Sequence, residues 1–250
     1  MGSSLAASGG ARTILITGAT DGIGRHTAQK MASDGNHLLI HGRQPKLGAQ
    51  IADELMARGA ASVKYFNADL GDLDEVERLA QDILGSDDVT AIDVLINNAG
   101  IFDPPRPAKS AQGYDLTWAV NVMAPFLLTR RLLPLVAASQ DGCPRIITTS
   151  SISQSWALPP LDELFEINDK PKGDHRAYSD SKLGDHMFTA QLAHVLGQHQ
   201  RLSRIKCLTM DPGTVNTKML IGMRVIYFVA IDGNLPCSQF CLPFLPAVLH

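Results

Sequence analysis

The sequence predicts an α/β protein, a single domain built around a doubly wound parallel sheet. Six short, β-rich apolar runs recur along the chain, at residues 13–17, 37–41, 62–66, 93–96, 145–149 and 204–210. Longer segments follow the first three runs, at 23–35, 48–59 and 73–84, and their apolar residues repeat every three or four positions, as in amphipathic helices. Near-continuous apolar strands that alternate with helices imply a parallel sheet covered on both faces.

Size and charge narrow the functional classes. The 250 residues are 45% hydrophobic and 19% charged, enough for one sizeable core. The net charge is −3 and the basic residues are scattered, so we expect no nucleic-acid partner. We also expect no transmembrane span and no metal site, because no uninterrupted apolar run is long enough and the histidines lack ligand spacing. Four cysteines without a CxxC pair, and no secretory signal, favour free thiols and a cytoplasmic location, with peripheral membrane association or an organelle left open.

The sequence TGATDGIG, residues 17–24, follows the first strand and opens the first helix. Its glycines, Gly18, Gly22 and Gly24, could be ordinary turn residues, or they could let the backbone approach a ligand closely. The free N–H groups of a helix N-terminus bind pyrophosphate when glycines allow that approach. The position between a strand and a helix therefore predicts a dinucleotide site.

The second strand ends in a residue that discriminates between the two nicotinamide cofactors. An acidic residue there would hold the ribose 2′-hydroxyl of NAD, whereas this chain carries Arg43. A guanidinium can pair with a 2′-phosphate through two hydrogen bonds, so NADP(H) is favoured. Arg25 could assist, and either arginine could instead be a solvated charge.

A tyrosine and a lysine, Tyr178 and Lys182, lie four residues apart on a predicted helix, so both point to one face. A phenol is a poor base at neutral pH, and a nearby ammonium stabilises its phenolate form. Ser150 and Ser151 follow the strand at 145–149, where parallel sheets present catalytic groups. Asn121 lies inside an apolar helical run, either as a functional amide or as a buried polar bridge.

Together these motifs resemble the short-chain dehydrogenase/reductase family, over about residues 12–218. The matching order is TGATDGIG, Asp69-Leu70, Asn97-Asn98-Ala99-Gly100, Asn121, Ser151, Tyr178-x-x-x-Lys182 and Asp211-Pro212-Gly213. The resemblance implies a Rossmann fold that binds a nicotinamide cofactor. The long interval between serine and tyrosine, and the form of the DPGTVNT segment, look most like the retinol-dehydrogenase-like branch, which acts on lipid-soluble alcohols and carbonyls.

The resemblance also implies a role for each matching residue. Tyr178 would be the general acid/base, Lys182 would stabilise its phenolate and bind the nicotinamide ribose, and Asn121 would hold a water that links the lysine to solvent. Ser151 would polarise the carbonyl, with Ser150 as the alternative. The remaining matches would bind the cofactor: Thr17, Gly18, Asp21, Gly22, Ile23 and Gly24 at the pyrophosphate, Asp69 and Leu70 at the adenine, Asn97, Ala99 and Gly100 beneath the nicotinamide, and Pro212, Gly213 and Thr217 over the cofactor.

Three segments lie outside this pattern. Residues 1–11 are expected to be a flexible leader, and the stretch between Ser151 and Tyr178 could be a lid or a surface excursion. Residues 219–250 form an atypical apolar C-terminal segment of the same domain, which could rebuild the substrate pocket or mark a truncated variant. The sequence therefore predicts an NADP(H)-dependent oxidoreductase for a small apolar or lipid-like carbonyl or alcohol, possible as a homodimer through helices at about 111–137 and 175–199. The alternative is a catalytically weak NADP(H)-binding regulatory or interaction protein.

Overall fold

Six parallel strands form one sheet in the order β3-β2-β1-β4-β5-β6 in the computed structural model, which describes residues 10–102, 104, 108–157 and 174–213. The strands are β1 (Thr13–Ile16), β2 (His37–Gly42), β3 (Ser62–Asn67), β4 (Val94–Asn97), β5 (Arg145–Thr149) and β6 (Lys206–Met210). This order is that of the doubly wound dinucleotide-binding sheet. The predicted fold class is confirmed, and each predicted strand lies within two residues of the observed one.

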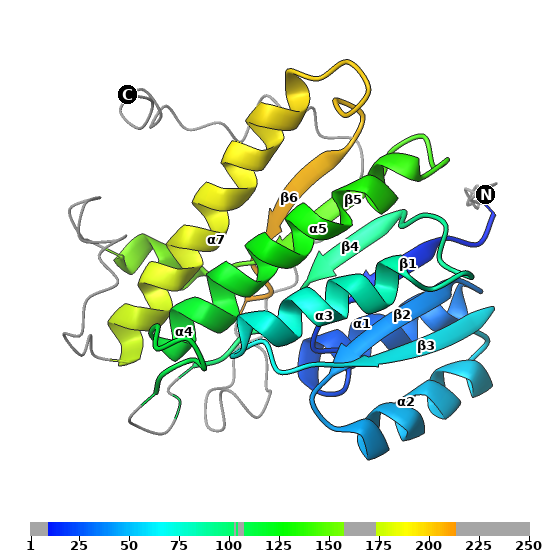
Figure 1. The fold of residues 1–250 in the computed structure, drawn as a ribbon, viewed down its shortest axis with the longest axis horizontal. Helices are drawn as coiled ribbons and strands as arrows, with labels where there is room; N and C mark the ends of the chain where they lie inside the picture. The colour runs from blue at the N-terminus through cyan, green and yellow to red at the C-terminus, as the bar shows by residue number, and fades with distance from the viewer. Residues whose placement is uncertain (1–9, 103, 105–107, 158–173, 214–250) are drawn as a thin grey trace, which may run out of the picture.

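The helices flank the sheet on both sides (Figure 1). Their bounds are α1 (Gly22–Ser33), α2 (Pro45–Ala57), α3 (Leu73–Leu84), α4 (Leu116–Trp118), the π-helical turn η1 (Ala119–Met123), α5 (Ala124–Ala138), the 3-10 turn η2 (Ile152–Trp156) and α7 (Asp174–Gly197). Local signals start several of them. Asp21 and Asp72 cap α1 and α3 through their carboxylates, and Pro45 opens α2 at the first helical position.

Two hydrophobic cores lie on opposite faces of the sheet, because alternate side chains of a strand point to opposite sides. In β1, Leu15 belongs to the core under α3 and α5, whereas Ile14 and Ile16 belong to the core under α1 and α2. Figure 1 shows α3, α5 and α7 crossing the near face of the sheet. Burial on both faces explains why the strands are almost continuously apolar.

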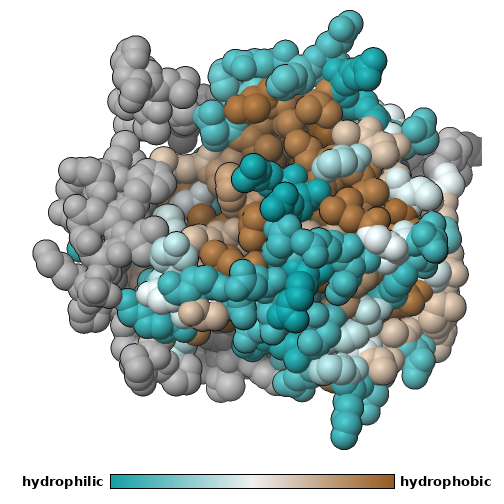
Figure 2. Space-filling model, viewed as in Figure 1, coloured by the Kyte–Doolittle hydropathy of each residue, from teal (hydrophilic) through white to brown (hydrophobic). Residues whose placement is uncertain are grey.

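The stretch Leu116–Ala138 is, by length and composition alone, apolar enough to cross a membrane, and half of its most apolar 18-residue window is buried inside the protein. Its buried side carries Leu128, Leu132 and Val136 into the core beneath α3 and α5. The same segment presents Phe126 outward, 49% exposed, and Figure 2 shows apolar side chains gathered over α5 and α7. Burial against the sheet accounts for the apolar inner side of this helix, and the outer side remains accessible.

The order of the strands changes direction at β1, because β1 pairs with β2 on one side and with β4 on the other. In such sheets, ligands bind at the carboxyl ends of the strands beside this reversal point. Thr17, Arg43, Asn98 and Ser150 lie just beyond the carboxyl ends of β1, β2, β4 and β5. The fold thus places the predicted cofactor and catalytic residues at one edge of the sheet.

Candidate active site

The glycine-rich turn is fixed to the loop after β4 by the Thr17 side chain. Thr17 Oγ1 accepts hydrogen bonds from the backbone N–H groups of Asn98 and Ala99, both at 3.0 Å. In return, Asn98 Nδ2 donates to the carbonyl of Thr17 at 2.9 Å and to that of Gly18 at 3.4 Å. Asn98 was part of the sequence motif without an assigned role, and the structure shows that it holds the turn in place.

The turn has the backbone that the glycines predict. Gly18 and Gly22 have φ values of 65° and 53°, in the left-handed region that favours glycine. A Cβ at Gly24 would overlap the carbonyl of Gly18 and the amide of Asn98. Asp21 accepts a hydrogen bond from the N–H of Gly22 at 2.9 Å and caps α1, while Ile23 in its first turn is half-buried. These residues make a closely packed turn that leads into a helix N-terminus, which fits a dinucleotide pyrophosphate.

The imidazole of His41 connects this turn to the end of β3, a role that the sequence analysis missed. His41 Nδ1 accepts from the N–H of Gly18 at 3.3 Å, and His41 Nε2 donates to the carbonyl of Ala68 at 3.1 Å. The side chain is 2% exposed. Burial lowers the pKa of His41 to about 4, so the ring is neutral at pH 7 with its proton on Nε2.

The two arginines considered for the 2′-phosphate differ in the structure. Arg43 follows β2 and is exposed. Arg25 is bound to Glu54, since its guanidinium forms an ion pair between α1 and α2. That hydrogen bond from Arg25 is the main reason why the pKa of Glu54 lies below its usual range. The arrangement favours Arg43 as the phosphate-binding residue.

The residues expected around the adenine and nicotinamide are distributed over three environments. Asp69 is exposed and accepts from the N–H of Gly71 at 2.9 Å, whereas Leu70 is packed in the core. Asn97 is buried and donates to Thr129 Oγ1 on α5 at 2.9 Å, so its amide braces the sheet against a helix. Ala99 lies against Gly18, and Gly100 lies beside Asn121 and Lys182.

Asn121 occupies the π-helical turn between α4 and α5, where the sequence predicted an ordinary helix. Asn121 Oδ1 accepts from the N–H of Ile101 at 2.8 Å, and Nδ2 donates to the carbonyl of Ile101 at 3.1 Å and to Ser181 Oγ at 2.9 Å. The side chain is 1% exposed. Asn121 therefore bridges the loop after β4 to α7. Single π-helical turns of this kind are frequent at functional sites.

The two serines after β5 have different surroundings. Ser150 is 3% exposed, and its hydroxyl lies 2.9 Å from the backbone carbonyl of Lys182, to which it donates. Ser151 is half-buried and caps η2, accepting from the N–H of Ser153 at 3.3 Å. Because that bond leaves the hydroxyl proton of Ser151 unused, Ser151 is the better donor to a ligand.

Tyr178 and Lys182 share one face of α7, as predicted. Lys182 Nζ lies 5.6 Å from the centroid of the Tyr178 ring. The Lys182 side chain is 4% exposed, and its ammonium donates to the carbonyl of Thr149 at 2.8 Å and to Asp185 Oδ2 at 2.9 Å. Burial raises the pKa of Asp185 to about 6, against the lowering effect of Lys182. Asp185 is a second residue that the sequence analysis missed, although its spacing of three from Lys182 placed it on the same helix face.

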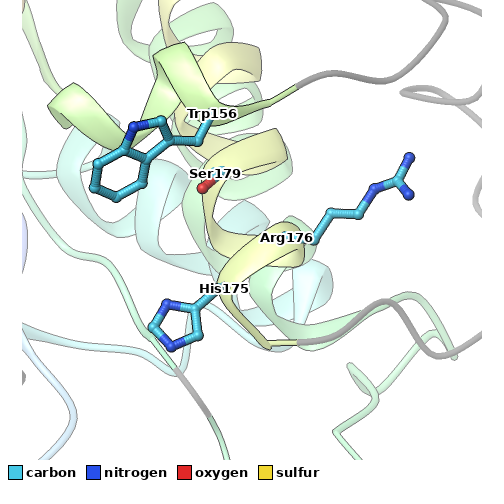
Figure 3. Close-up of a pocket in the computed structure, with 4 residues that line it drawn as sticks. All are labelled: Trp156, His175, Arg176 and Ser179. Atoms are coloured by element: carbon cyan, nitrogen blue, oxygen red, sulfur yellow. The ribbon is translucent and has the colours of Figure 1, made fainter.

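Phe102 links the rings of Tyr178 and His175 near the surface. Phe102 meets the Tyr178 ring edge to face, with centroids 5.2 Å apart, and meets His175 at 5.1 Å. A cavity of about 350 Å³ next to them is lined by Trp156, His175, Arg176 and Ser179. Figure 3 shows Arg176 pointing away from Trp156 and His175. Tyr178 thus contacts the ring of Phe102 and is itself partly exposed.

The remaining predicted residues lie after β6. Gly213 has a φ of 68° and donates its N–H to Asp211 Oδ1 at 2.9 Å, so Asp211, Pro212 and Gly213 form a tight turn. Thr217, the C-terminal segment 219–250, most of the leader and residues 158–173 of the possible lid lie outside the described residues. Within the described part of the chain, no group of three His, Cys, Asp or Glu residues could hold a metal ion.

Residues 12–159 match the family model described as short chain dehydrogenase. Among curated relatives, the chain is 29% identical to the short-chain dehydrogenase/reductase pkfC of Emericella nidulans, covering 90% of this chain and 74% of the relative. It is 31% identical to human dehydrogenase/reductase SDR family member 13, covering 84% and 53%, and 30% identical to mouse retinol dehydrogenase 14, covering 83% and 62%. The chain thus spans between about half and three quarters of the length of these relatives.

Solved structures of the same family have the same fold. An NADP complex of Pseudomonas aeruginosa RhlG superposes with a TM-score of 0.64 at 26% identity, covering 83% of this chain and 74% of that one. A metagenomic short-chain oxidoreductase in complex with NADP gives a TM-score of 0.62 at 28% identity, covering 82% and 83%. The predicted family and its retinol-dehydrogenase-like relatives are therefore confirmed.

Proposed function

The chain belongs to the short-chain dehydrogenase/reductase family, and we propose that it is an NADP(H)-dependent oxidoreductase that interconverts a carbonyl and an alcohol. The observation that carries this proposal is the arrangement on α7 and η2. Tyr178 is half-exposed, the Lys182 ammonium lies 5.6 Å from its ring, and the Ser151 hydroxyl stands at the end of β5. An acid/base, a cation and a hydrogen-bond donor are the groups that reduction of a carbonyl requires.

The cofactor is NADP(H), and when bound it supplies or accepts the hydride. The left-handed turn at Gly18 and Gly22 and the N-terminus of α1 would hold its pyrophosphate. Arg43 would bind the 2′-phosphate, because it is an exposed guanidinium at the end of β2. NADP complexes among the similar solved structures support this assignment.

The catalytic roles follow from the contacts. Ser151 donates a hydrogen bond to the substrate oxygen and so stabilises the negative charge that develops there during reduction. Tyr178 gives its phenolic proton to that oxygen, or removes the proton when the reaction runs as an oxidation. Lys182 stabilises the phenolate, and Asn121 holds the loop at Ile101 against α7. Thr149 and Ser150 fix the ammonium and the backbone of Lys182.

The substrate class is a small apolar or lipid-like alcohol or carbonyl. The aromatic ring of Phe102 against Tyr178, and Trp156 in the cavity beside His175, suit an apolar ligand. Relatives of this chain include proteins named retinol dehydrogenase 14 and polyprenol dehydrogenase. Both names refer to lipid alcohols, which supports the same class here.

A second candidate is an NADP(H)-binding regulatory or interaction protein with little turnover. The observation that favours it is the ion pair between Lys182 and Asp185, which offsets the positive charge that catalysis needs. The chain retains Ser151, Tyr178 and Lys182, the three residues that would carry out catalysis, and this favours the enzyme.

NADPH fluorescence and carbonyl consumption separate these candidates. We expect the wild type and Tyr178→Phe to bind NADPH equally well, and only the wild type to consume NADPH when aldehydes, ketones or retinoids are added. Binding without turnover that depends on Tyr178 would reject the enzyme and leave the regulatory protein.

A homodimer through α5 and α7 is part of the proposal. Phe126 of α5 and Phe188 of α7 meet edge to face at 5.5 Å on the outer side of these helices, and Phe126 is 49% exposed. Sedimentation should show a dimer that Phe126→Glu converts to a monomer; a wild-type monomer would reject this part. The proposed location is the cytoplasm, and cell fractionation distinguishes it from a membrane or an organelle.

A further inference from the structure

The carboxylate of Asp185 is the buried counter-charge of the Lys182 ammonium. Asp185 lies three residues after Lys182 on α7, and their side chains are 1% and 4% exposed. Lys182 Nζ donates to Asp185 Oδ2 at 2.9 Å and to the carbonyl of Thr149 at 2.8 Å. The ammonium is therefore held between a strand end and a carboxylate, both away from water.

Packing alone does not explain a carboxylate at this position. Asp185 Oδ1 is buried and has no hydrogen-bond partner among the described residues. A buried charge with an unsatisfied oxygen is costly, and an uncharged side chain of similar size would avoid that cost. Burial raises the pKa of Asp185 to about 6, close enough to neutrality for the carboxyl to change its charge under ordinary conditions.

Lys182 is the group whose charge acts on Asp185. The elements packed most closely against α7 are η2, β5, β6, α4 and η1, and of these η2, α4 and η1 carry no titratable residue. α5 also contacts α7 through Phe126, and its titratable residues, Arg130 and Arg131, are both exposed to solvent. Arg145 of β5 and Lys206 of β6, with Cys207 beside it, lie at the opposite end of their strands from Thr149, about 13 Å away along the strand. Apart from this pair, the titratable residues of α7 are Asp174, His175, Arg176, Tyr178, Asp180, His186 and His194, and Asp211 follows β6.

The pair also lies next to the predicted cofactor site. A Cβ on Gly100, in the loop expected beneath the nicotinamide, would lie 3.6 Å from Lys182 Nζ. The same Nζ faces the ring of Tyr178. A change in the net charge of the pair would therefore be felt by both the cofactor and Tyr178.

We infer that Asp185 is a positioning residue, whose carboxylate fixes the Lys182 ammonium and offsets its charge toward the cofactor until Asp185 takes up a proton. The inference rests on the proposed function in that Lys182 is taken as the group that meets the cofactor. With Asp185 ionised, the pair is neutral overall; with Asp185 protonated, it carries one positive charge. An anionic cofactor then binds more tightly, by about 3- to 10-fold for one charge at about 10 Å in a partly screened site.

NADPH affinity measured against pH tests this inference directly. We would measure the NADPH dissociation constant by fluorescence between about pH 5 and pH 8, for the full chain and for Asp185→Asn. The 2′-phosphate of the cofactor, with a pKa of about 6, titrates in this range in both proteins alike, and His41, with a pKa of about 4, is neutral over most of it in both. The ratio of the two dissociation constants therefore isolates the effect of Asp185 protonation on NADPH binding.

The NADPH dissociation constant of the wild type divided by that of Asp185→Asn should be about 3 to 10 above pH 7 and should fall toward one near pH 5. A ratio that stays constant with pH would overturn the inference, because a merely structural role changes the affinity by the same factor throughout. Asp185→Glu keeps the charge and should restore the pH dependence. Asp93→Asn is the matched control: it removes a hydrogen-bonded carboxylate at the amino end of β4, and its ratio should not change with pH.

A second measurement does not depend on the folding of the Asp185 variants. Carboxyl carbon NMR of the wild type and of Lys182→Met should show the titration of Asp185 moving to higher pH in the variant, because Lys182 lowers the pKa of that carboxyl. An unchanged titration would show that the pair is not coupled and would reject the inference. Both measurements are made without turnover, so a protein that binds NADPH but reduces no carbonyl would fail the proposed function and still decide the role of Asp185.

Discussion

The neutral imidazole of His41 accepts a hydrogen bond from the backbone N–H of Gly18 at 3.3 Å, and so joins the end of β2 to the glycine-rich turn after β1. The same ring donates to the carbonyl of Ala68 just beyond β3. Three adjacent strand ends are thus connected through one side chain. Protonation of Nδ1 would replace the acceptor by a donor that faces the N–H of Gly18.

Acid should therefore destabilise the protein through His41. The folded pKa is about 4, below the ordinary 6.5, so the stabilisation is complete above pH 6.5 and is lost as the pH falls through 4. The shift corresponds to about 3 kcal/mol. Urea unfolding at a series of pH values gives the free energy of unfolding as a function of pH. Its decrease on acidification should be smaller in His41→Asn and unchanged in His199→Asn, an exposed control. Equal slopes in all three proteins would contradict the prediction.

The effect of acid on stability through Asp185 should have the opposite sign. Its folded pKa of about 6 lies above the ordinary 3.8, so its contribution is full below pH 3.8 and is lost as the pH rises through 6. The magnitude is again about 3 kcal/mol, and the two effects offset each other between about pH 4 and pH 6. In Asp185→Asn the free energy of unfolding should fall more steeply on acidification than in the wild type. A slope unchanged by this variant would argue against the prediction.

Arg43→Ala should weaken NADPH selectively. Loss of a charge-assisted pair with the 2′-phosphate should raise the NADPH dissociation constant about 10- to 100-fold and leave that of NADH nearly unchanged. Arg25→Ala is the control, because its guanidinium is bound to Glu54. Fluorescence titration with both cofactors measures the effect. Equal losses for NADPH and NADH would show that Arg43 does not read the 2′-phosphate.

Gly24→Ala should disrupt the turn. The added methyl would overlap the carbonyl of Gly18 and the amide of Asn98, both of which hold the pyrophosphate loop in place. We expect a loss of about 1–3 kcal/mol in stability and weaker NADPH binding. A Cβ at Gly142 would meet nothing within 4 Å, so Gly142→Ala should have neither effect. Thermal unfolding and NADPH titration of both variants give the comparison; normal binding by Gly24→Ala would refute the tight contact.

The two serines after β5 should separate into a catalytic and a structural residue. Under the proposed function, Ser151→Ala should lower kcat about 10²- to 10³-fold with little change in stability. Ser150→Ala should cost about 1 kcal/mol of stability, because it removes the bond to the carbonyl of Lys182, and should affect kcat less. Steady-state kinetics and urea unfolding measure both. The reverse ranking of kcat would assign the donor role to Ser150.

The sequence was sufficient to predict features encoded in neighbouring residues. Strands and helices followed from apolar periodicity, and the turn at Gly18 and Gly22 from glycines between a strand and a helix. Tyr178 and Lys182 share a helix face because their spacing requires it. These predictions needed no knowledge of how distant segments meet.

The features that the sequence could not give depend on contacts between segments. His41 of β2 reaches Ala68 just beyond the neighbouring strand β3, and the role of Asp185 depends on burial as well as spacing. The burial of Leu70 in the core and the ion pair of Arg25 with Glu54 of another helix are likewise contacts between segments. Nothing in the apolar run around Asn121 distinguishes a π-helical turn from an ordinary helix.

That π-helical turn has a consequence for the two halves of the Leu116–Ala138 segment. One extra residue per turn rotates the side chains after Met123 relative to those before it, by about 100°. The first half can thus direct Trp118 at Gly184 of α7 while the second half directs Leu128 and Leu132 into the sheet. Deleting a single residue at this turn would give a more regular helix that could no longer pack against both α7 and the sheet. The π-helical turn therefore determines which way the side chains of each half of the segment point.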